Sequence, residues 1–387
     1  MMSRFGFNLP TRIEFGSGVL SLVGQVAAEI TGGRRVFLVS DEGLKNAGLV
    51  GKVEDSLKAA GFELLVFDQV KPNPRASDCE AGGEAAKAFG ADLIVALGGG
   101  SVLDSAKAIA LLQTHGGPLR KYEGRGKVTR PVMPIIAIPT TAGTGSEVTR
   151  SAVITDTERQ FKMTVKDLLL APKLALVDPE TTYSLPKALT ASTGMDALVH
   201  AIEAYTCTEA NPMADLLALE AMRNIYPALP RVVRDGSDYE ARDAMMFGSL
   251  LAGLAFSHAD VAAVHCMAEA VGGLYDIPHG VANSIFLPVV TAYNASSDYN
   301  KHAATAAACG LPVGGVSDQE AAEYLVRELA LLAAAIGIPR LKDLDMINPA
   351  DFPRLAQASA INGSTPSNCR PVNENDYLAL FKKTYEQ

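Results

Sequence analysis

Three histidines and one aspartate in the second half of the sequence have the types and spacing of a metal-binding group. Asp196 and His200 are four residues apart in a helical pattern, so both side chains can point toward one ion. His265 lies in another apolar helical stretch, and His279 lies in a Pro-His-Gly turn. A single buried histidine is usually a satisfied core residue. Four polar groups in largely apolar surroundings are harder to explain that way, because unpaired polar groups there are costly.

Mixed imidazole and carboxylate ligands suit Zn²⁺ or Fe²⁺, and no cysteine is placed to complete a thiolate zinc site. A metal with an open coordination position supplies Lewis-acid chemistry. It lowers the pKa of an alcohol and, in the reverse direction, polarises the carbonyl of an aldehyde. The four residues therefore indicate chemistry at the oxygen of a small alcohol or aldehyde.

A glycine-rich loop in the first half is suited to binding a phosphate. The apolar run 93–97 leads directly into the Gly-Gly-Gly-Ser loop of residues 98–101, and a helical pattern carrying Asp104 and Lys107 follows. Glycines let the backbone approach an anion closely, and a helix start offers N–H groups and the positive end of its dipole. The usual GxGxxG fingerprint is absent, so a simple tight turn is the alternative.

Two further segments favour a dinucleotide. Residues 139–147, after the next predicted strand, carry hydroxyls that could bind ribose, phosphate or the nicotinamide amide, although capping of the next helix is an alternative. Asp41 directly follows a predicted strand, where a carboxylate can accept hydrogen bonds from ribose hydroxyls and repel the 2′-phosphate of NADP. Its alternative is an exposed helix cap. Ligands of open α/β sheets bind at the carboxyl ends of strands, so the segments together favour NAD.

The candidate NAD-binding segments and the candidate metal ligands lie in two halves of the sequence that have different secondary-structure patterns. In the first half, β-rich apolar runs alternate with amphipathic stretches such as 49–60 and 102–112, which is the pattern of a parallel sheet with helices on both faces. The strand-like runs are residues 35–40, 64–67, 93–97, 135–138 and 174–177. After Pro186, long Ala- and Leu-rich segments have helical spacing. We predict an α/β NAD-binding domain over residues 1–185 and an all-helical metal and substrate domain over residues 186–387.

Composition narrows the class of protein. A length of 387 residues favours two domains, and a net charge of −9 with a pI of about 5.3 argues against binding to nucleic acid. No stretch reaches transmembrane length, and the N-terminus lacks the apolar segment of a signal peptide, so we expect no membrane association. The cysteines form no CxxC pair and are odd in number, which favours a reducing cytoplasm. They are Cys79, Cys207, Cys266, Cys309 and Cys369.

Over nearly its whole length the sequence resembles the iron-containing (group III) alcohol dehydrogenases. The resemblance implies a dehydroquinate synthase-like architecture, with an α/β N-terminal dinucleotide-binding domain and an all-α C-terminal metal-binding domain, and it implies a homodimer or larger homo-oligomer. The motifs that match in order and spacing are Phe15-Gly16-Ser17-Gly18, Pro72-Asn73-Pro74, Gly98-Gly99-Gly100-Ser101 with Asp104 and Lys107, Pro139 to Glu147, Gly194 to His200, and Pro278-His279-Gly280-Val281-Ala282-Asn283.

The resemblance assigns roles to individual residues by motif position. It implies that Asp196, His200, His265 and His279 hold the metal. The candidate NAD-binding residues are Asp41, Asn73, Gly99, Gly100, Ser101, Val102, Asp104, Thr140, Thr141, Thr144, Val153 and Lys162.

Two positions depart from the family pattern, and both are expected near the substrate. His258 stands where asparagine is usual, and Glu269 stands where the family has a second histidine, four residues after His265. That histidine is thought to assist near the nicotinamide or in proton transfer. We therefore take His265, His279 and Glu269 as the candidate catalytic residues, and whether Glu269 replaces the histidine in function is left open.

The sequence thus predicts an NAD-dependent enzyme with a divalent metal, Fe²⁺ or alternatively Zn²⁺, that interconverts a small primary alcohol and its aldehyde. A zinc-type glycerol or diol dehydrogenase is the first alternative. A dehydroquinate synthase-like lyase is weaker, because residues 195–280 lack a dense Lys and Arg cluster for a phosphorylated substrate. A purely structural metal site would leave the NAD loops unexplained. The substrate stays open and includes a diol or an anionic aldehyde.

Overall fold

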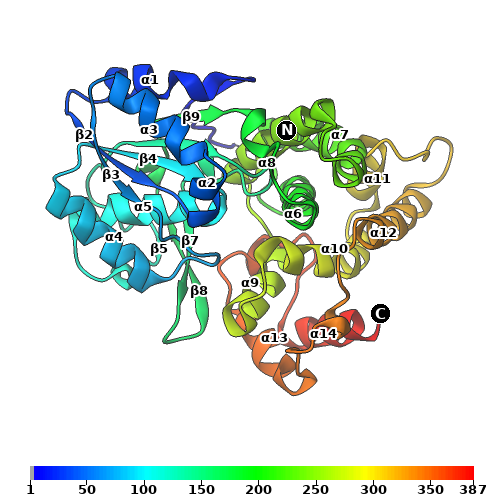
Figure 1. Ribbon diagram of the computed structural model, residues 1–387. Helices are drawn as coiled ribbons and strands as arrows, with labels where there is room; N and C mark the ends of the chain where they lie inside the picture. The colour runs from blue at the N-terminus through cyan, green and yellow to red at the C-terminus, as the bar shows by residue number, and fades with distance from the viewer. Residues whose placement is uncertain (1–3) are drawn as a thin grey trace. The chain divides into compact units, whose positions relative to one another are not determined.

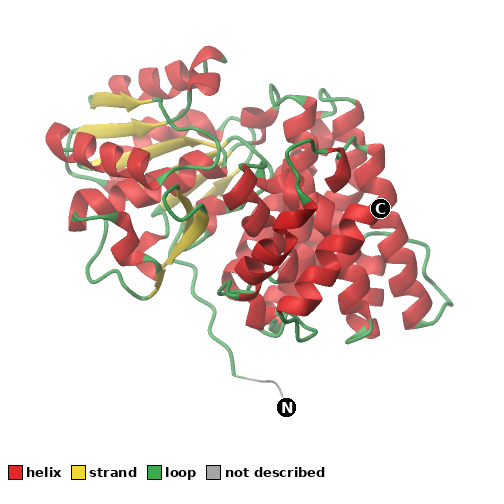
Figure 2. Cartoon of the chain, turned by 90° about the horizontal axis from the view of Figure 1, so that it is seen from below, coloured by secondary structure: helices red, strands yellow, loops and turns green. Residues whose placement is uncertain are grey.

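The computed structural model describes residues 4–387, which fall into two compact units. The sheet unit comprises Leu9–Thr141 and Gly145–Ser184. The helical unit comprises Leu185–Gln387 together with Ala142–Thr144 and the first described residues, through Asn8. Figure 2 shows the strands in the first of these units and helices throughout the second. We predicted that residue 185 separates two independently folding domains, and this boundary stays a prediction.

The main sheet of the sheet unit has six parallel strands in the order β1-β9-β6-β4-β2-β3. Figure 1 labels β2, β3, β4 and β9 of this sheet. The strands are β1 (Arg12–Phe15), β2 (Arg35–Val39), β3 (Glu63–Phe67), β4 (Leu93–Gly98), β6 (Ile135–Pro139) and β9 (Leu174–Val177). All but β1 coincide with apolar runs that predicted strands, and the predicted α/β class is confirmed. The strand β1 was not predicted because it is a short, partly exposed edge strand that carries two charged residues.

Side chains of this sheet alternate between two cores, as the two-residue period of a strand requires. In β4, Leu93, Val95 and Leu97 pack on one face with apolar residues of α1 and α3. Ile94 and Ala96 pack on the other face with residues of α4 and α5. The helices of this unit are α1 (Val23–Ile30), α2 (Glu42–Asn46), α3 (Leu49–Ala59), α4 (Ala76–Phe89) and α5 (Gly100–His115). Both predicted amphipathic stretches, 49–60 and 102–112, are therefore helices on opposite faces of the sheet.

A second, three-stranded sheet in the order β5-β8-β7 was missed at the sequence level. It consists of β5 (Gly124–Arg125), β7 (Ser151–Asp156) and β8 (Phe161–Lys166). β7 and β8 form an antiparallel hairpin, and its buried Ile154 and Val165 pack against Leu111 of α5. Two alternating β-branched runs around a polar turn were the available signal. The hairpin carries Val153 and Lys162, so it belongs to the candidate cofactor site.

The helical unit is built around α6 (Lys187–Thr206), which is buried along nearly its whole length and packs against α7, α8 and α10. A helix covered on all sides is a core helix, which explains its apolar composition. The remaining helices are α7 (Pro212–Arg234), α8 (Tyr239–His258), α9 (Ala263–Tyr275), α10 (His279–Ala295), α11 (Tyr299–Ala308), α12 (Asp318–Ala335), α13 (Phe352–Ala360) and α14 (Glu374–Glu386). The helical character predicted for the second half is confirmed.

Among the described residues, no single helix has the length and apolar character needed to cross a membrane. Helices α8 and α9 meet that criterion only when taken together, with a bend of 100° between them, and buried core helices of soluble proteins do the same.

Candidate metal centre and cofactor loops

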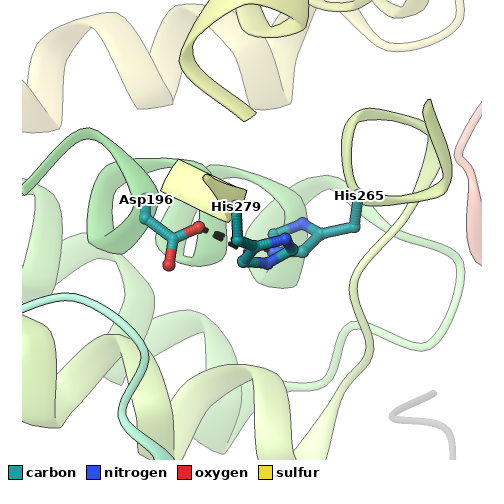
Figure 3. A group of neighbouring side chains, drawn as sticks. All are labelled: Asp196, His265 and His279. Atoms are coloured by element: carbon teal, nitrogen blue, oxygen red, sulfur yellow. Dashed lines mark ion pairs between the residues drawn. The ribbon is translucent and has the colours of Figure 1, made fainter. Parts of the chain in front are cut away.

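Asp196, His265 and His279 come together inside the helical unit, and each comes from a different helix (Figure 3). One ligand atom from each side chain lies within 4.8 Å of the other two. Nε2 of His279 is 3.8 Å from Asp196 Oδ1, and Nε2 of His265 is 3.9 Å from the same oxygen. The first and last of these three residues, Asp196 and His279, are more than 80 positions apart in the sequence, and the fold brings them together.

His200 joins this group from the next turn of α6. Its Nε2 is 3.0 Å from Nε2 of His265, and its Nδ1 is 3.9 Å from Asp196 Oδ2. Asp196, His200 and His265 are each less than 5% exposed, while the side chain of His279 is 26% exposed. All four predicted ligands thus form one buried cluster, henceforth the Asp-His cluster, with its accessible side at His279.

Local sequence explains how His279 is held at the cluster. Pro278 is the N-terminal cap residue and has a non-helical ψ of 131°, so α10 begins at His279. The next residue, Gly280, packs directly on the backbone of α6: a Cβ at this position would lie 2.4 Å from the carbonyl oxygen of Ser192. Only glycine allows this approach. The Pro-His-Gly sequence therefore docks the start of α10 on α6 beside Asp196.

Asn283, one turn after His279, connects two members of the cluster. Its Nδ2 donates to Asp196 Oδ1 at 2.6 Å and lies 3.1 Å from Nε2 of His279. A donor in this place favours an unprotonated, lone-pair-bearing Nε2 on His279. The motif that contains Asn283 was noted in the sequence, but this contact was not predicted.

The electrostatics of the cluster favour an ionised aspartate and a neutral His200. Burial alone would raise the pKa of Asp196, but the neighbouring histidines and the hydrogen bond from Asn283 outweigh it and lower the pKa. Burial lowers the pKa of His200 to about 4. For His265, burial acts in the same direction, but the hydrogen bond and charge of Glu203 outweigh it, and the pKa is raised.

This donor set fits one divalent cation. In a tetrahedral site with metal–ligand bonds of about 2.0–2.2 Å, neighbouring ligand atoms lie roughly 3.3–3.6 Å apart. Nε2 of His265 lies 3.0 Å from Nε2 of His200 and 3.9 Å from Asp196 Oδ1, and Nε2 of His279 lies 3.8 Å from the same oxygen. Imidazole nitrogens with a carboxylate oxygen suit Fe²⁺ or Zn²⁺. The Asp-His cluster could therefore hold either ion.

In the sheet unit, Asp41, the glycine loop, and Thr140 and Thr141 follow the carboxyl ends of three neighbouring strands, β2, β4 and β6. The glycine loop ends β4 and starts α5, with Gly99 as the N-terminal cap residue. The backbone N–H of Thr140 donates to the carbonyl of Gly98 at 3.1 Å. A Cβ at Gly99 would lie 3.1 Å from Cγ2 of Thr141. The two loops are thus in contact, as expected for parts of one phosphate and ribose site.

Within the glycine loop, the members differ in what they can offer a ligand. Gly100 and Ser101 form the first turn of α5, where backbone N–H groups favour an anion. The side chain of Val102 is buried in the core beneath the sheet, so only its backbone could contact a cofactor.

Asp41 caps helix α2, as the alternative interpretation of this residue stated. Its Oδ1 accepts a hydrogen bond from the N–H of Leu44 at 2.9 Å. Capping and ribose binding are compatible, because a carboxylate has two oxygens and Oδ2 makes no hydrogen bond with the described residues.

The side chain of Asp104 links several elements of the sheet unit through hydrogen bonds. Its Oδ1 accepts from Ser146 Oγ at 2.6 Å and its Oδ2 accepts from the N–H of Val153 at 2.9 Å. Lys107, whose side chain is fully buried, lies 3.7 Å from Asp104 and donates to Ser146 Oγ at 2.7 Å. These contacts join α5 to the loop after β6 and to β7.

Asn73 and Lys162 are in direct contact, although 89 positions separate them. Lys162 Nζ donates to Asn73 Oδ1 at 2.8 Å, and both residues are buried. Asn73 has a φ of 52°, a left-handed conformation that asparagine tolerates between its two prolines. Thr144 packs with the helical unit instead of the sheet unit.

Glu269 and His258 occupy different surroundings within the helical unit. Oε2 of Glu269 accepts from Nδ2 of Asn362 at 2.6 Å, and the charge of Glu269 contributes to the raised pKa of His265. His258 ends α8, where its ring stacks on Phe7 with centroids 3.8 Å apart and its Nε2 lies 2.9 Å from the carbonyl oxygen of Asn8.

Comparison with known proteins places the chain in a family. The family described as "Iron-containing alcohol dehydrogenase" matches residues 10–179, and "Fe-containing alcohol dehydrogenase family, C-terminal" matches residues 190–385. The chain belongs to the iron-containing alcohol dehydrogenases. The predicted membership is thereby confirmed.

Individual relatives are similar to this chain over nearly its full length. The chain is 41% identical to the 1,3-propanediol dehydrogenase of Citrobacter freundii, covering 98% of this chain and 99% of the relative. It is 37% identical to the NAD-dependent methanol dehydrogenase of Bacillus methanolicus, with 97% and 98% covered. A crystal structure of 1,3-propanediol oxidoreductase superposes with a TM-score of 0.95 at 40% identity, covering 99% and 100%.

Family membership establishes the class of reaction. The protein is an NAD-dependent, iron-containing alcohol dehydrogenase that interconverts an alcohol and its aldehyde by hydride transfer. The predicted function and cofactors are confirmed at this level. The individual site residues stay predictions.

Proposed function

We propose that the Asp-His cluster is the iron site of this dehydrogenase and that its substrate is a short aliphatic alcohol, with diols included. The observation that carries the proposal is the convergence of Asp196, His265 and His279 inside the helical unit, where one ligand atom from each lies within 4.8 Å of the others, with Nε2 of His200 3.0 Å from Nε2 of His265. The names of two full-length relatives, a 1,3-propanediol dehydrogenase and a methanol dehydrogenase, support a small substrate of one or a few carbons.

Iron bound at the cluster would supply Lewis-acid chemistry at the substrate oxygen, and NAD would supply the hydride acceptor. Residues of the chain itself set the charge and the orientation of the metal ligands. Asp196 supplies a negative charge, His200 is held neutral by burial, and Asn283 orients Asp196 and His279 through its amide nitrogen. The side of the cluster at His279 is the accessible one, so we place substrate entry there.

For the cofactor, we propose that the first turn of α5, at Gly100 and Ser101, binds the pyrophosphate and that Asp41 binds the adenosine ribose. The helix start provides N–H groups and a favourable dipole for an anion. Thr140 and Thr141 would add hydroxyl groups at the neighbouring strand end. Asn73, Asp104, Val153 and Lys162 would act mainly by holding the hairpin and the loops in place, as their mutual contacts support.

Oxidation of an alcohol by NAD releases a proton, and we propose Glu269 as the residue that accepts it. Glu269 lies one helical turn after His265, is half-buried, and has one carboxylate oxygen fixed by Asn362. A positioned carboxylate can act as a general base. Glu269→Gln should lower the rate of alcohol oxidation and change its pH dependence, while a simple structural role would change thermal stability and leave the pH profile as it was.

We further propose a cytoplasmic homodimer or larger homo-oligomer. All five cysteines are free thiols, and four are buried, which suits a reducing compartment. Light scattering of the purified protein would measure the oligomeric state directly.

Anaerobic NADH oxidation with a panel of short aldehydes tests the proposed function. Chelator-stripped protein would be reconstituted with Fe²⁺, with Zn²⁺ or with no metal. We expect activity to return with Fe²⁺ and to be highest with aldehydes of one to four carbons. Activity that is restored only by Zn²⁺ and is confined to polyols would favour the zinc-type diol dehydrogenase. Full activity without metal would contradict the proposal.

A further inference from the structure

Glu203 is a buried acidic residue that no motif in the sequence singled out. It lies on α6, three residues after His200 and seven after Asp196, so the three side chains share one face of the helix. Only 2% of the residue is exposed. Removing a carboxylate from water is costly unless hydrogen bonds compensate for it, so its partners reveal what it does.

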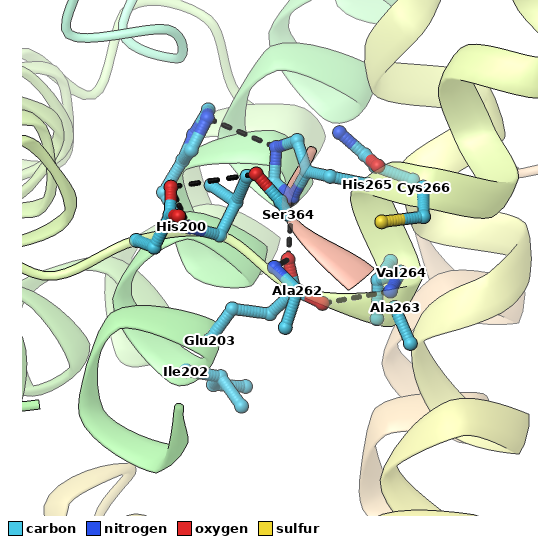
Figure 4. Close-up of polar contacts among 12 residues, drawn as sticks. His200, Ile202, Glu203, Ala262, Ala263, Val264, His265, Cys266 and Ser364 are labelled. Carbon is cyan, nitrogen blue, oxygen red and sulfur yellow. Dashed lines mark hydrogen bonds and ion pairs between the residues drawn. The ribbon is translucent and has the colours of Figure 1, made fainter. Parts of the chain in front are cut away.

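The carboxylate of Glu203 accepts three hydrogen bonds (Figure 4). Oε1 accepts from the N–H of Val264 at 2.7 Å. Oε2 accepts from the N–H of Ala262 at 2.9 Å and lies 2.6 Å from Nδ1 of His265. All three donors belong to the start of α9, so Glu203 connects α6 to the beginning of that helix.

Two of these bonds cap α9. The N-terminal cap residue of α9 is Ala262, which has no side chain able to accept a hydrogen bond. The first N–H groups of a helix lack partners within the helix, and a negative charge at this end is favourable. Glu203, which lies on α6, supplies both the hydrogen-bond acceptor and the negative charge to the start of α9. This capping fixes where α9 begins and therefore where His265, on its first turn, is placed.

The third bond fixes the chemistry of His265. An ionised carboxylate can only accept, so Nδ1 of His265 must carry the hydrogen. In the neutral ring, the lone pair is then on Nε2. This nitrogen faces the Asp-His cluster, 3.0 Å from Nε2 of His200 and 3.9 Å from Asp196 Oδ1.

We propose that Glu203 is the positioning residue of the metal centre: it selects the Nδ1–H tautomer of His265 and anchors the start of α9, so that Nε2 is presented as a ligand. This inference rests on the proposed function of the Asp-His cluster. A carboxylate that orients a metal-binding histidine also raises its ligand strength, and loss of such a partner typically weakens metal binding 10- to 100-fold.

Glu203→Gln tests the hydrogen-bonding role at nearly constant shape. If the amide oxygen takes the place of Oε2, the amide nitrogen faces the N–H of Val264. If the amide is turned over, its nitrogen faces Ala262 and His265, and the ring must change tautomer to accept. Each orientation puts a donor against a donor. Glu203→Asp keeps the charge, and we expect metal binding in it to be closer to that of the wild type.

Asn211→Ala is the matched control for the loss of a buried helix cap. Asn211 caps α7 in the same unit by accepting from the N–H of Ala214, and it has no contact with the Asp-His cluster. We expect both Asn211→Ala and Glu203→Gln to lower the melting temperature. Only Glu203→Gln should weaken metal binding.

The experiment measures Fe²⁺ affinity of the full-length protein anaerobically, by competition with a chromophoric chelator. We expect Glu203→Gln to lower the affinity 10- to 100-fold and Asn211→Ala to change it less than threefold, while both bind NADH as the wild type does. Equal iron affinity in Glu203→Gln and wild type would overturn the inference. Failure of the wild-type protein itself to bind iron would instead overturn the proposed function.

A second measurement determines the tautomer in the wild-type protein itself. The chain has six histidines, so ¹⁵N NMR of metal-free wild-type protein labelled at histidine can resolve their tautomers. His265 should show hydrogen on Nδ1, and the signal is assigned by its loss in His265→Ala. A metal-free His265 with its hydrogen on Nε2 alone would overturn the inference.

Discussion

Asp104 in the sheet unit, whose side chain is 16% exposed, and the buried Asp196 in the helical unit are surrounded in different ways. Asp104 has a lysine of its own: Lys107 lies 3.7 Å away, and a hydroxyl and a backbone N–H complete its hydrogen bonds. The ion-pair partners described for Asp196 are histidines, at 3.8–3.9 Å, and burial keeps one of them, His200, neutral by lowering its pKa to about 4.

The difference separates a structural charge cluster from a ligand-binding one. The carboxylate of Asp104 is satisfied within the protein and ties α5 to β7. The carboxylate of Asp196 is surrounded by ring nitrogens that are themselves donors to a metal, so a divalent cation is the natural counter-charge. The two clusters should therefore respond oppositely to mutation: one in stability, the other in metal binding and turnover.

The largest effect is expected at the metal ligands. His265→Ala or His279→Ala should lower kcat/KM by about 10³-fold or more, because the Lewis-acid contribution is worth several kcal/mol. NADH binding, measured by fluorescence titration, should change less than threefold. His115→Gln, which removes a histidine at the end of α5, serves as the control and should retain activity. Retained turnover in a metal-depleted His279→Ala protein would contradict the assignment.

Removing the lysine of the other cluster should act on stability. Lys107→Met keeps much of the side-chain volume but leaves the largely buried carboxylate of Asp104 without its cation, which is expected to cost about 3–5 kcal/mol. Thermal unfolding followed by circular dichroism would measure it as a marked fall in melting temperature. Iron affinity should remain that of the wild type. If Lys107→Met lost iron while keeping its melting temperature, the claim that Asp104 and Lys107 have a structural role and do not bind the metal would be wrong.

Glu147 offers a pH test in the same part of the sheet unit. Burial raises its pKa from 4.5 to about 7. Between these values the folded protein holds a proton that the unfolded chain has released, so stability falls as the pH rises from about 4.5 to 7. Glu147→Gln removes this dependence. We expect its gain over wild type in the free energy of unfolding to grow from pH 5 to pH 7 and then level off, reaching about 1–3 kcal/mol. A constant difference at all pH values would refute the argument.

A smaller effect is expected for cofactor choice. Asp41→Asn keeps an oxygen that can cap α2 but removes the charge that would repel a 2′-phosphate. We expect the preference for NADH over NADPH, measured as a ratio of kcat/KM values, to fall about tenfold, a change of about 1.4 kcal/mol. Asp41→Ala should show the same loss of preference together with a lower melting temperature. An unchanged ratio in both variants would remove Asp41 from the cofactor site.

The sequence was most informative where a pattern is periodic or a residue type is chemically unusual. Buried apolar runs predicted the interior strands of the main sheet, because a strand covered on both faces has to be apolar along its length. Asp196 and His200 were recognisable because a helix places residues four apart on one face. His265 and His279 rested on their apolar surroundings and on the resemblance to the family.

What could not be predicted depends on contacts between distant segments. The strand β1 has two charged residues and none of its four residues is fully buried, so no apolar run marked it. The link of Lys162 to Asn73 spans 89 positions. Glu203 looked like an ordinary helical glutamate until α9 was placed against it, although its spacing of seven from Asp196 was a signal that a search along α6 could have found.

Iron binding and coordination test the central claim most directly. Iron content and Fe K-edge X-ray absorption would be measured on anaerobically reconstituted wild-type protein and on the His265→Ala, His279→Ala double variant. Our account predicts one Fe²⁺ per wild-type chain with a first shell of nitrogen and oxygen that includes imidazoles, and loss of that iron in the double variant. Stoichiometric iron with an unchanged absorption spectrum in the double variant would show that the metal is bound elsewhere.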